Sequence, residues 1–325
     1  MKAINLLPRI LLSLVFTASL AFAQEQKPPS SGEIEAAKKV QDAKDLPAKM
    51  KQAEEYMKKN SKSSLRPKVA EYLAIEISNV NDPKQRLSYL ESYSKLFSTE
   101  AEQGYVLAAY VDAYAQTDKL DDAFKLAPKA LEKQPDNILL MTQLAIKGSN
   151  VVRQGNAAYA QHTKQYATKA LEIVEADKKP ASISDQFWTE IKTKWVPELH
   201  QALGFVAFAA GEGAEAKMRF QKVVELSPTS LNSYLMLADY ANNDYQRAAM
   251  DYNTASGAAK DAALQKAYGH MDLVIDYYAR VVALTQSKPE FKQIHDQVWQ
   301  ALQETYKVRK GSLDGLQQLV DKYKK

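Results

Sequence analysis

The sequence contains no cysteine and little glycine, with 11 Gly among 325 residues. The lack of cysteine excludes disulfides, thiol chemistry and a lipid-acceptor cysteine after an export signal. Glycine is well below its usual share of about 7%. Alanine, leucine, lysine, glutamine and glutamate are abundant, and these residues favour helices. The composition therefore predicts an all-α protein.

Sequence signatures of catalysis are also missing. The four histidines are scattered and form no H-E-x-x-H pair, so a zinc site is not expected. They are His162, His200, His270 and His295. There is no G-x-S-x-G nucleophile elbow, and the short Gly211-Glu212-Gly213 segment follows a helix rather than a strand. We expect no enzyme activity, no cofactor and no metal; an envelope hydrolase is the alternative from a different class.

The N-terminus has the layout of a secretory signal peptide. Residues 1–23 contain Lys2, Arg9, an apolar run and a final Ala21-Phe22-Ala23. The apolar run is shorter than the ~20 residues that span a bilayer, which makes a retained membrane helix the weaker alternative. Cleavage after Ala23 lowers the formal charge from +4 to +2, because Lys2 and Arg9 are removed with no acid. This near balance gives no reason to expect nucleic acid as a partner.

Residues 24–33 contain two prolines and two serines and have no periodic apolar pattern, which predicts a flexible linker. We expect a mature protein that begins at Gln24, is periplasmic or secreted, and has no integral membrane segment. The sequence leaves its oligomeric state open.

A repeat signature lies in residues 197–230. Small residues stand where two helices must approach closely, large apolar residues stand beside them, and a proline ends the second helix. These positions are Leu203, Gly204, Ala216, Phe220 and Pro228. The spacing resembles that of the tetratricopeptide (TPR) repeat, whose signature is W-x-x-L-G-x-x-Y, A-x-x-x-F, P. His200 replaces the signature Trp, and we expect it to pack in that place.

A second, more degenerate copy covers residues 104–137. Ala123 and Pro135 are 12 positions apart, as are Ala216 and Pro228. In this copy Val111 replaces the signature glycine and Ala127 the second-helix aromatic residue. A single helical hairpin cannot bury its own apolar face, so the resemblance implies neighbouring hairpins.

We therefore expect a TPR-like helical-hairpin solenoid over residues 34–325, with irregular repeats and a C-terminal capping helix. The cap is assigned to residues 312–323, where Leu313, Leu316, Leu319 and Val320 form an apolar stripe. Residues 242–269 interrupt the repeat rhythm. They are interpreted either as a longer helix that shields a neighbouring repeat or as a binding insertion. Trp188 and Trp195 are expected to pack between helices rather than to stack on a ligand.

The resemblance implies a partner site on the concave face, formed by the first helix of each hairpin. The partner-binding candidates are Asp112, Gln201, Phe205, Asp239, Asn242 and Asn243. Residues 104–116, 197–209 and 231–243 contain no Lys or Arg, which argues against clamping of a C-terminal carboxylate. An extended polypeptide or a basic segment fits better, with Phe205 as the aromatic anchor. The opposing interpretation is that these residues only pack or are solvated.

The function expected from these features is that of a non-enzymatic protein-interaction scaffold in the cell envelope, with a protein or peptide as its partner. The alternative within this class is a structural subunit of an envelope assembly or secretion complex.

Overall fold

The computed structural model describes residues 28–324, which form helices and turns with no strand. The predicted all-α fold is confirmed over these residues. The predicted signal peptide, residues 1–23, lies outside the described residues. None of the helices formed by residues 28–324 has the length and hydrophobicity needed to cross a membrane.

The described chain divides into two compact units. The single solenoid over residues 34–325 stays a prediction. Among the described residues, the first unit comprises residues 28–148 and 175–184, and the second residues 149–174 and 185–324.

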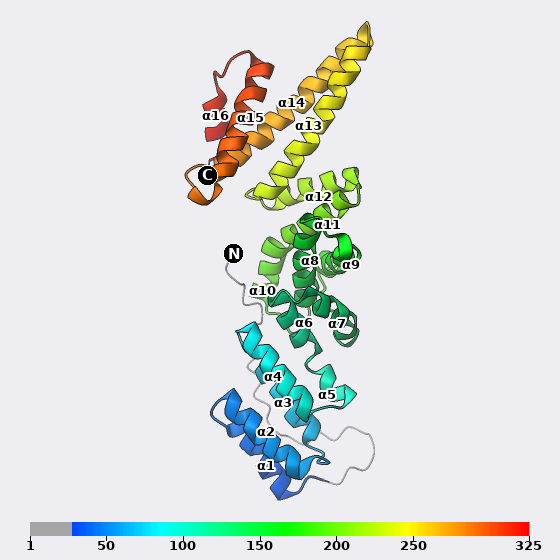
Figure 1. The fold of residues 1–325 in the computed structure, drawn as a ribbon, viewed down its shortest axis with the longest axis vertical. Helices are drawn as coiled ribbons and strands as arrows, with labels where there is room; N and C mark the ends of the chain where they lie inside the picture. The colour runs from blue at the N-terminus through cyan, green and yellow to red at the C-terminus, as the bar shows by residue number, and fades with distance from the viewer. Residues whose placement is uncertain (1–27, 325) are drawn as a thin grey trace. The chain divides into compact units, whose positions relative to one another are not determined.

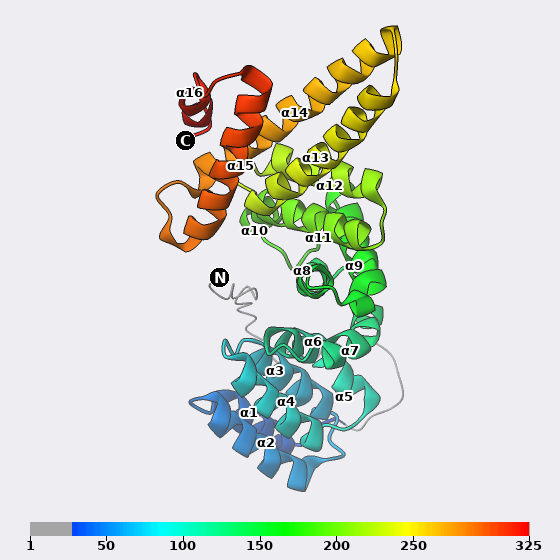
Figure 2. The same cartoon turned by 45° about the horizontal axis from the view of Figure 1, so that its top comes forward.

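The first unit consists of antiparallel helices that pack in succession (Figure 2). They are α1 (Ser31–Asp42), α2 (Leu46–Asn60), α3 (Arg66–Ser78), α4 (Pro83–Leu96), α5 (Glu100–Gly104), α6 (Leu107–Gln116), α7 (Leu120–Lys133) and the first part of α8 (Ile138–Arg153). One buried core extends from Ala37 and Val40 in α1 to Ala113 in α6.

Local capping explains where these helices begin. The Ser30 side chain accepts a hydrogen bond from the Glu33 amide while Glu33 bonds back to Ser30, a capping box that starts α1 at Ser31. The last three residues of the predicted linker, 31–33, are therefore helical, which corrects that boundary. Asp45 caps α2 with its side chain, and Pro47 lies in the first turn of that helix, where a missing N–H costs nothing.

The second unit begins within α8 and contains longer helices (Figure 1). They are η1 (Ala157–Tyr159), α9 (Ala160–Glu175), α10 (Asp185–Glu190), the π-helical turn η2 (Ile191–Trp195), α11 (Val196–Ala209), α12 (Gly213–Leu226), α13 (Leu231–Thr254), α14 (Ala258–Thr285), η3 (Pro289–Phe291), α15 (Lys292–Lys310) and α16 (Leu316–Asp321). Trp188 and Trp195 are each 6% exposed, which confirms that they pack.

The hairpin α11–α12 carries the repeat signature. A Cβ atom on Gly204 would lie 2.8 Å from Cε1 of Phe220, so glycine is required by the close approach of that ring. The ring, rather than Ala216 as the signature suggested, provides the nearest atoms to Gly204. His200 is only 5% exposed, which confirms that it packs in the place of the signature Trp.

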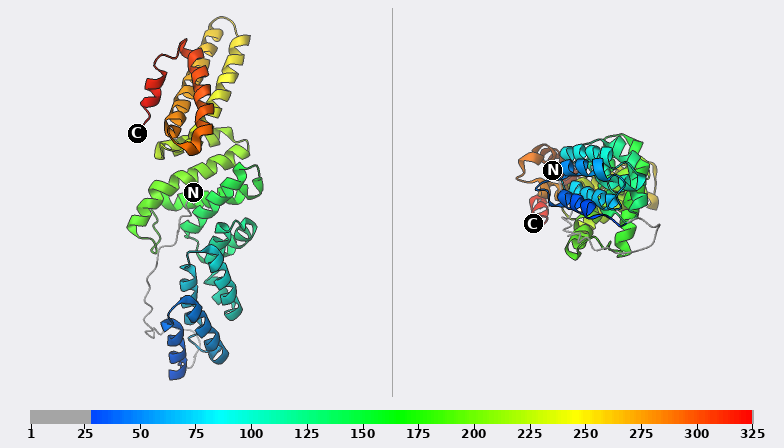
Figure 3. Two further views of the ribbon diagram at one scale, coloured as in Figure 1. Left: turned by 60° about the vertical axis from the view of Figure 1, so that its left-hand side comes forward. Right: turned by 90° about the horizontal axis from the view of Figure 1, so that it is seen from below.

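The predicted insertion at 242–269 forms the end of α13 and the start of α14. These two helices are antiparallel neighbours, with Gly257 (φ 56°) at the turn between them (Figures 1 and 3). At the C-terminus α16 packs against α14 as a cap, with Leu316 and Val320 buried. Leu313, expected in the same stripe, is 43% exposed because it precedes the helix.

Candidate functional site

Within residues 28–324, each unit contains a groove lined largely by first helices of its hairpins. The first groove, about 410 Å³, lies among the end of α3, the start of α6, the start of α8 and the loop before α10. Its lining residues are Ala74, Ile75, Ser78, Asn79, Tyr105, Ala108, Ala109, Asp112, 134, 136–140, Gln143, Pro180, Ser182 and Ile183. All of them belong to the first unit.

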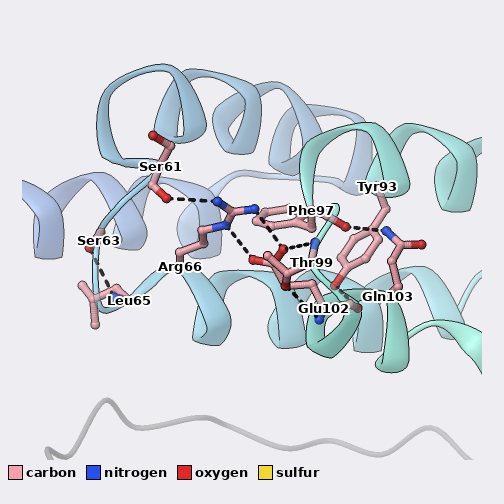
Figure 4. Close-up of polar contacts among 9 residues, drawn as sticks. All are labelled: Ser61, Ser63, Leu65, Arg66, Tyr93, Phe97, Thr99, Glu102 and Gln103. Carbon is pink, nitrogen blue, oxygen red and sulfur yellow. Dashed lines mark hydrogen bonds and ion pairs between the residues drawn. The ribbon is translucent and has the colours of Figure 1, made fainter. Parts of the chain in front are cut away.

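The short helix α5 fixes the position of Tyr105 at the edge of the first groove. Arg66 in α3 donates from Nε and Nη2 to both carboxylate oxygens of Glu102, at 2.6 and 2.9 Å. Tyr93 Oη donates to the Glu102 carbonyl at 3.0 Å, and Gln103 donates to the Phe97 carbonyl (Figure 4). Thr99 completes the anchor with a capping box.

Glu102 stays ionised in this anchor. Its burial raises the pKa, but hydrogen bonds from Arg66 and Thr99 outweigh that effect and hold the pKa of the carboxyl below its usual range. The ion pair between Arg66 and Glu102 therefore links α3 to α5. This link fixes the backbone position of Tyr105, which follows α5 and is 38% exposed.

Asp112 lies in the lining of the first groove but is already engaged. Its Oδ2 accepts hydrogen bonds from Arg86 Nη1 at 2.5 Å and from Gln116 Nε2 at 2.7 Å, and the residue is 8% exposed. Arg86, in α4, is itself 2% exposed. This ion pair holds α4 against α6, because a buried charge without its partner is strongly unfavourable. Asp112 therefore has a packing role, and its predicted part in partner binding stays a prediction.

The second groove encloses about 500 Å³ within the second unit. It lies among the end of α8, the turn before α9, and helices α11 and α13. Its lining residues are Val152, Arg153, Gly155, Ala157, Phe205, Phe208, Ala209, Asn232, Leu235 and Met236.

Two phenylalanines in this groove differ in exposure. Phe205 is 6% exposed, and its ring meets Phe220 edge-on at 5.2 Å between centroids. Phe208, one helical turn further, is 48% exposed and meets Tyr240 edge-on at 6.3 Å. Phe205 is thus part of the core, and Phe208 is the aromatic side chain available to a partner. The exposure of Phe208 makes it a stronger anchor candidate than Phe205, whose predicted role stays a prediction.

A basic residue also lines the second groove, contrary to the expectation from the first helices alone. The guanidinium carbon of Arg153 lies 5.6 Å from the centre of the Phe205 ring, a cation–π contact. Arg153 is exposed, and no carboxylate within residues 28–324 pairs with it. The repeat pattern does not predict this residue, because it lies in the last turn of α8, outside the first-helix ranges that lack Lys and Arg.

The remaining predicted residues lie outside both grooves. Gln201 donates to Ser230 Oγ at 3.0 Å and to Ser233 Oγ at 3.2 Å, so it ties α11 to the start of α13. Asp239 and Asn243 are exposed further along α13, where Asn243 Nδ2 donates to Asp239 Oδ2 at 3.5 Å. Asn242 is half-buried on the same helix. The structure does not bring these residues together with Phe205 in one groove.

Potential metal ligands are dispersed in the part of the chain that the structure describes. Across residues 28–324, no group of three or more His, Cys, Asp or Glu side chains is arranged to hold a metal ion.

Comparison with known proteins gives little beyond the fold. No family model matches the chain, and no curated protein matches it. Among solved structures, it is similar to a tetratricopeptide repeat protein from Parabacteroides merdae, with a TM-score of 0.38 and 13% sequence identity over 82% of this chain and 98% of that one. The TPR-like character of the chain is supported by the spacing and packing of its own hairpins.

Proposed function

We propose that the protein is a non-enzymatic scaffold that acts outside the cytoplasmic membrane and binds an extended polypeptide segment in the second groove. The observation that carries this proposal is Phe208, 48% exposed in a groove beside Arg153, with which no carboxylate of residues 28–324 pairs. A large aromatic side chain gains most by burial, and exposed aromatic residues in a concave site are typical anchors for partners.

The lining suggests what the segment carries. An aliphatic or aromatic side chain of the partner packs against Phe208, Leu235 and Met236, which form the apolar part of the groove. A carboxylate of the partner pairs with Arg153, whose planar guanidinium suits bidentate binding. Asn232 supplies an amide that can both donate to and accept from a peptide backbone. An acidic, apolar segment therefore fits this groove better than the basic segment expected from the sequence.

The experiment uses a displayed library of random dodecapeptides selected on the mature chain. Enriched peptides are synthesised and titrated against the unmodified chain, Phe208→Ser and Met218→Ser. Met218 is a matched control, because it is 50% exposed and lies on α12 outside the second groove. We expect Phe208→Ser to weaken binding by about 2 kcal/mol, as for a hot spot, and Met218→Ser to leave the affinity unchanged. Equal affinity for all three chains contradicts the proposal.

Export is the second part of the proposal, and it is supported by Lys2, Arg9 and Ala21-Phe22-Ala23. Intact-mass measurement of the protein recovered from the cell envelope should give an N-terminus at Gln24. Recovery with Met1 intact contradicts cleavage and favours the membrane-anchored alternative.

A further inference from the structure

The loop between α9 and α10 lines the first groove with two apolar side chains. Pro180 and Ile183 both line it and are buried, Ile183 to 4% exposure. Between them Ala181 and Ser182 are exposed. Burial of this kind is unusual for a segment without regular secondary structure, because loops generally run over the surface.

Local hydrogen bonds form this segment into a compact turn. The Ile183 amide donates to the Pro180 carbonyl at 3.0 Å, which closes a four-residue turn. Lys179 Nζ donates to the Ile183 carbonyl at 3.0 Å from the preceding side. In such a turn the first and fourth Cα atoms lie within about 7 Å of each other. Pro180 and Ile183 therefore form one apolar pair, separated by the exposed tip.

The groove matches this turn in chemistry. Ala74, Ala108 and Leu139 contribute apolar wall, each from a different helix. Asp136 lies at the exposed edge, and no cation within residues 28–324 pairs with its carboxylate. Lys178 and Lys179 directly precede the turn and give residues 178–184 a formal charge of +2, opposite in sign to that of Asp136.

We propose that the first groove is a binding site for a basic peptide segment with an apolar-x-x-apolar turn, and that residues 178–184 occupy it as a built-in ligand. A partner polypeptide with the same chemistry binds by displacing them. This rests on the proposed function, since it assigns a second kind of peptide to the same class of concave site. The partner thus differs from the acidic segment proposed for the second groove.

The test uses a labelled synthetic peptide of residues 178–184, whose binding is measured by fluorescence anisotropy. The double variant Pro180→Ser/Ile183→Ser removes the two apolar side chains and keeps the length of the segment. Ala181→Ser is the matched control at the exposed tip. We expect the peptide to bind the double variant roughly tenfold more tightly than the unmodified chain, as it does if the groove is free only about a tenth of the time in the latter. Ala181→Ser should behave like the unmodified chain, and a peptide with serine at both apolar positions should not bind.

The intact chain gives a measurement that does not depend on these variants folding. An unlabelled excess of the same peptide, above the roughly millimolar effective concentration of the tethered segment, should speed hydrogen exchange at the Ile183 amide. Equal peptide affinity for a folded double variant and the unmodified chain, or unchanged exchange at Ile183, overturns the inference. If library peptides still lose affinity with Phe208→Ser, the proposed function stands and only this assignment fails.

Discussion

The hairpins α6–α7 and α11–α12 share one spacing but distribute side-chain volume differently. In α11–α12 the first helix has Gly204 and the second has Phe220, whereas the equivalent positions of α6–α7 are Val111 and Ala127. The side chains of Phe220, Val111 and Ala127 are all fully buried. A larger residue on one helix is thus matched by a smaller one on the other, because a packed core tolerates exchange of shape better than a change in total volume.

The two grooves also differ in the side chains that line them. Phe220 reaches the space above Gly204 and meets Phe205, on which Arg153 lies, so the second groove is built on contacting aromatic rings. The first groove has a single aromatic residue, Tyr105, in its lining and is otherwise lined by small, aliphatic and polar side chains and by the chain's own turn at 180–183. Similar hairpins therefore support an open aromatic groove in one unit and a self-occupied groove in the other.

The largest expected effect on stability comes from replacing residues of α11–α12 by their equivalents in α6–α7. Phe220→Ala should lower the free energy of unfolding by about 3–5 kcal/mol, because it leaves a cavity at a fully buried site. Adding Gly204→Val recreates the Val–Ala combination and should recover part of this loss, with a coupling energy of about 1 kcal/mol or more. Denaturant titration of the two single variants and the double variant measures the coupling. Additive losses contradict the idea of exchanged volume.

A pH effect distinguishes the same two hairpins. Burial and the neighbouring Arg219 and Lys222 lower the pKa of His200 from 6.5 to about 4, so the folded protein holds this imidazole neutral while the unfolded chain protonates it. The contribution of neutral His200 to the free energy of unfolding should therefore be fully present above about pH 6.5. It should be lost as the pH falls toward 4, by up to about 3 kcal/mol. The equivalent residue in α6 is Leu107, which does not titrate.

The variant His200→Leu places at this position the leucine that α6 has at the equivalent position, and it serves as the control. Thermal melts at pH 7 and pH 4.5 should show a smaller acid-induced loss for His200→Leu than for the unmodified chain, since acidic groups elsewhere contribute equally to both. The same acid-induced loss in the two proteins rules out His200 as its source.

Gly204→Leu without compensation tests the close approach directly. Its side chain would meet Phe220 at 2.8 Å already at Cβ, so overpacking should cost about 1–3 kcal/mol. Ala123→Leu in the α6–α7 hairpin should cost less, because the residue at the aromatic position is small there. An unchanged melting temperature for Gly204→Leu contradicts the assignment of the signature.

The smallest expected effect concerns charge in the second groove. Arg153→Gln should weaken an acidic library peptide by about 0.5–1 kcal/mol, roughly two- to fivefold, the size of an exposed cation–π or ion-pair contribution. The loss should shrink at high salt. Arg247→Gln, an exposed arginine on α13 that pairs with Asp244, is the control. A stronger effect at Arg247 places the acidic contact elsewhere.

The sequence was sufficient to predict the hairpins but not the residues that face a partner. The packing roles of Gly204, Ala216 and Phe220 could be predicted because packing within a repeat requires side chains of particular sizes at particular spacings. Periodicity does not report which of Phe205 and Phe208 is exposed, since both lie on the first helix and burial depends on α12 and α13. The pairing of Asp112 with Arg86 and the entry of Ile183 into a groove join residues distant in sequence, for which no local pattern exists.

The central claim is that a peptide binds in the second groove and leaves the first groove unchanged. Hydroxyl-radical footprinting with a selected library peptide tests it, because exposed Met, Phe and Tyr side chains are oxidised and bound ones are protected. The account predicts protection of Phe208 and Met236, with unchanged oxidation of Met218, Met250 and Tyr105. Protection at Tyr105 without protection at Phe208 would contradict it.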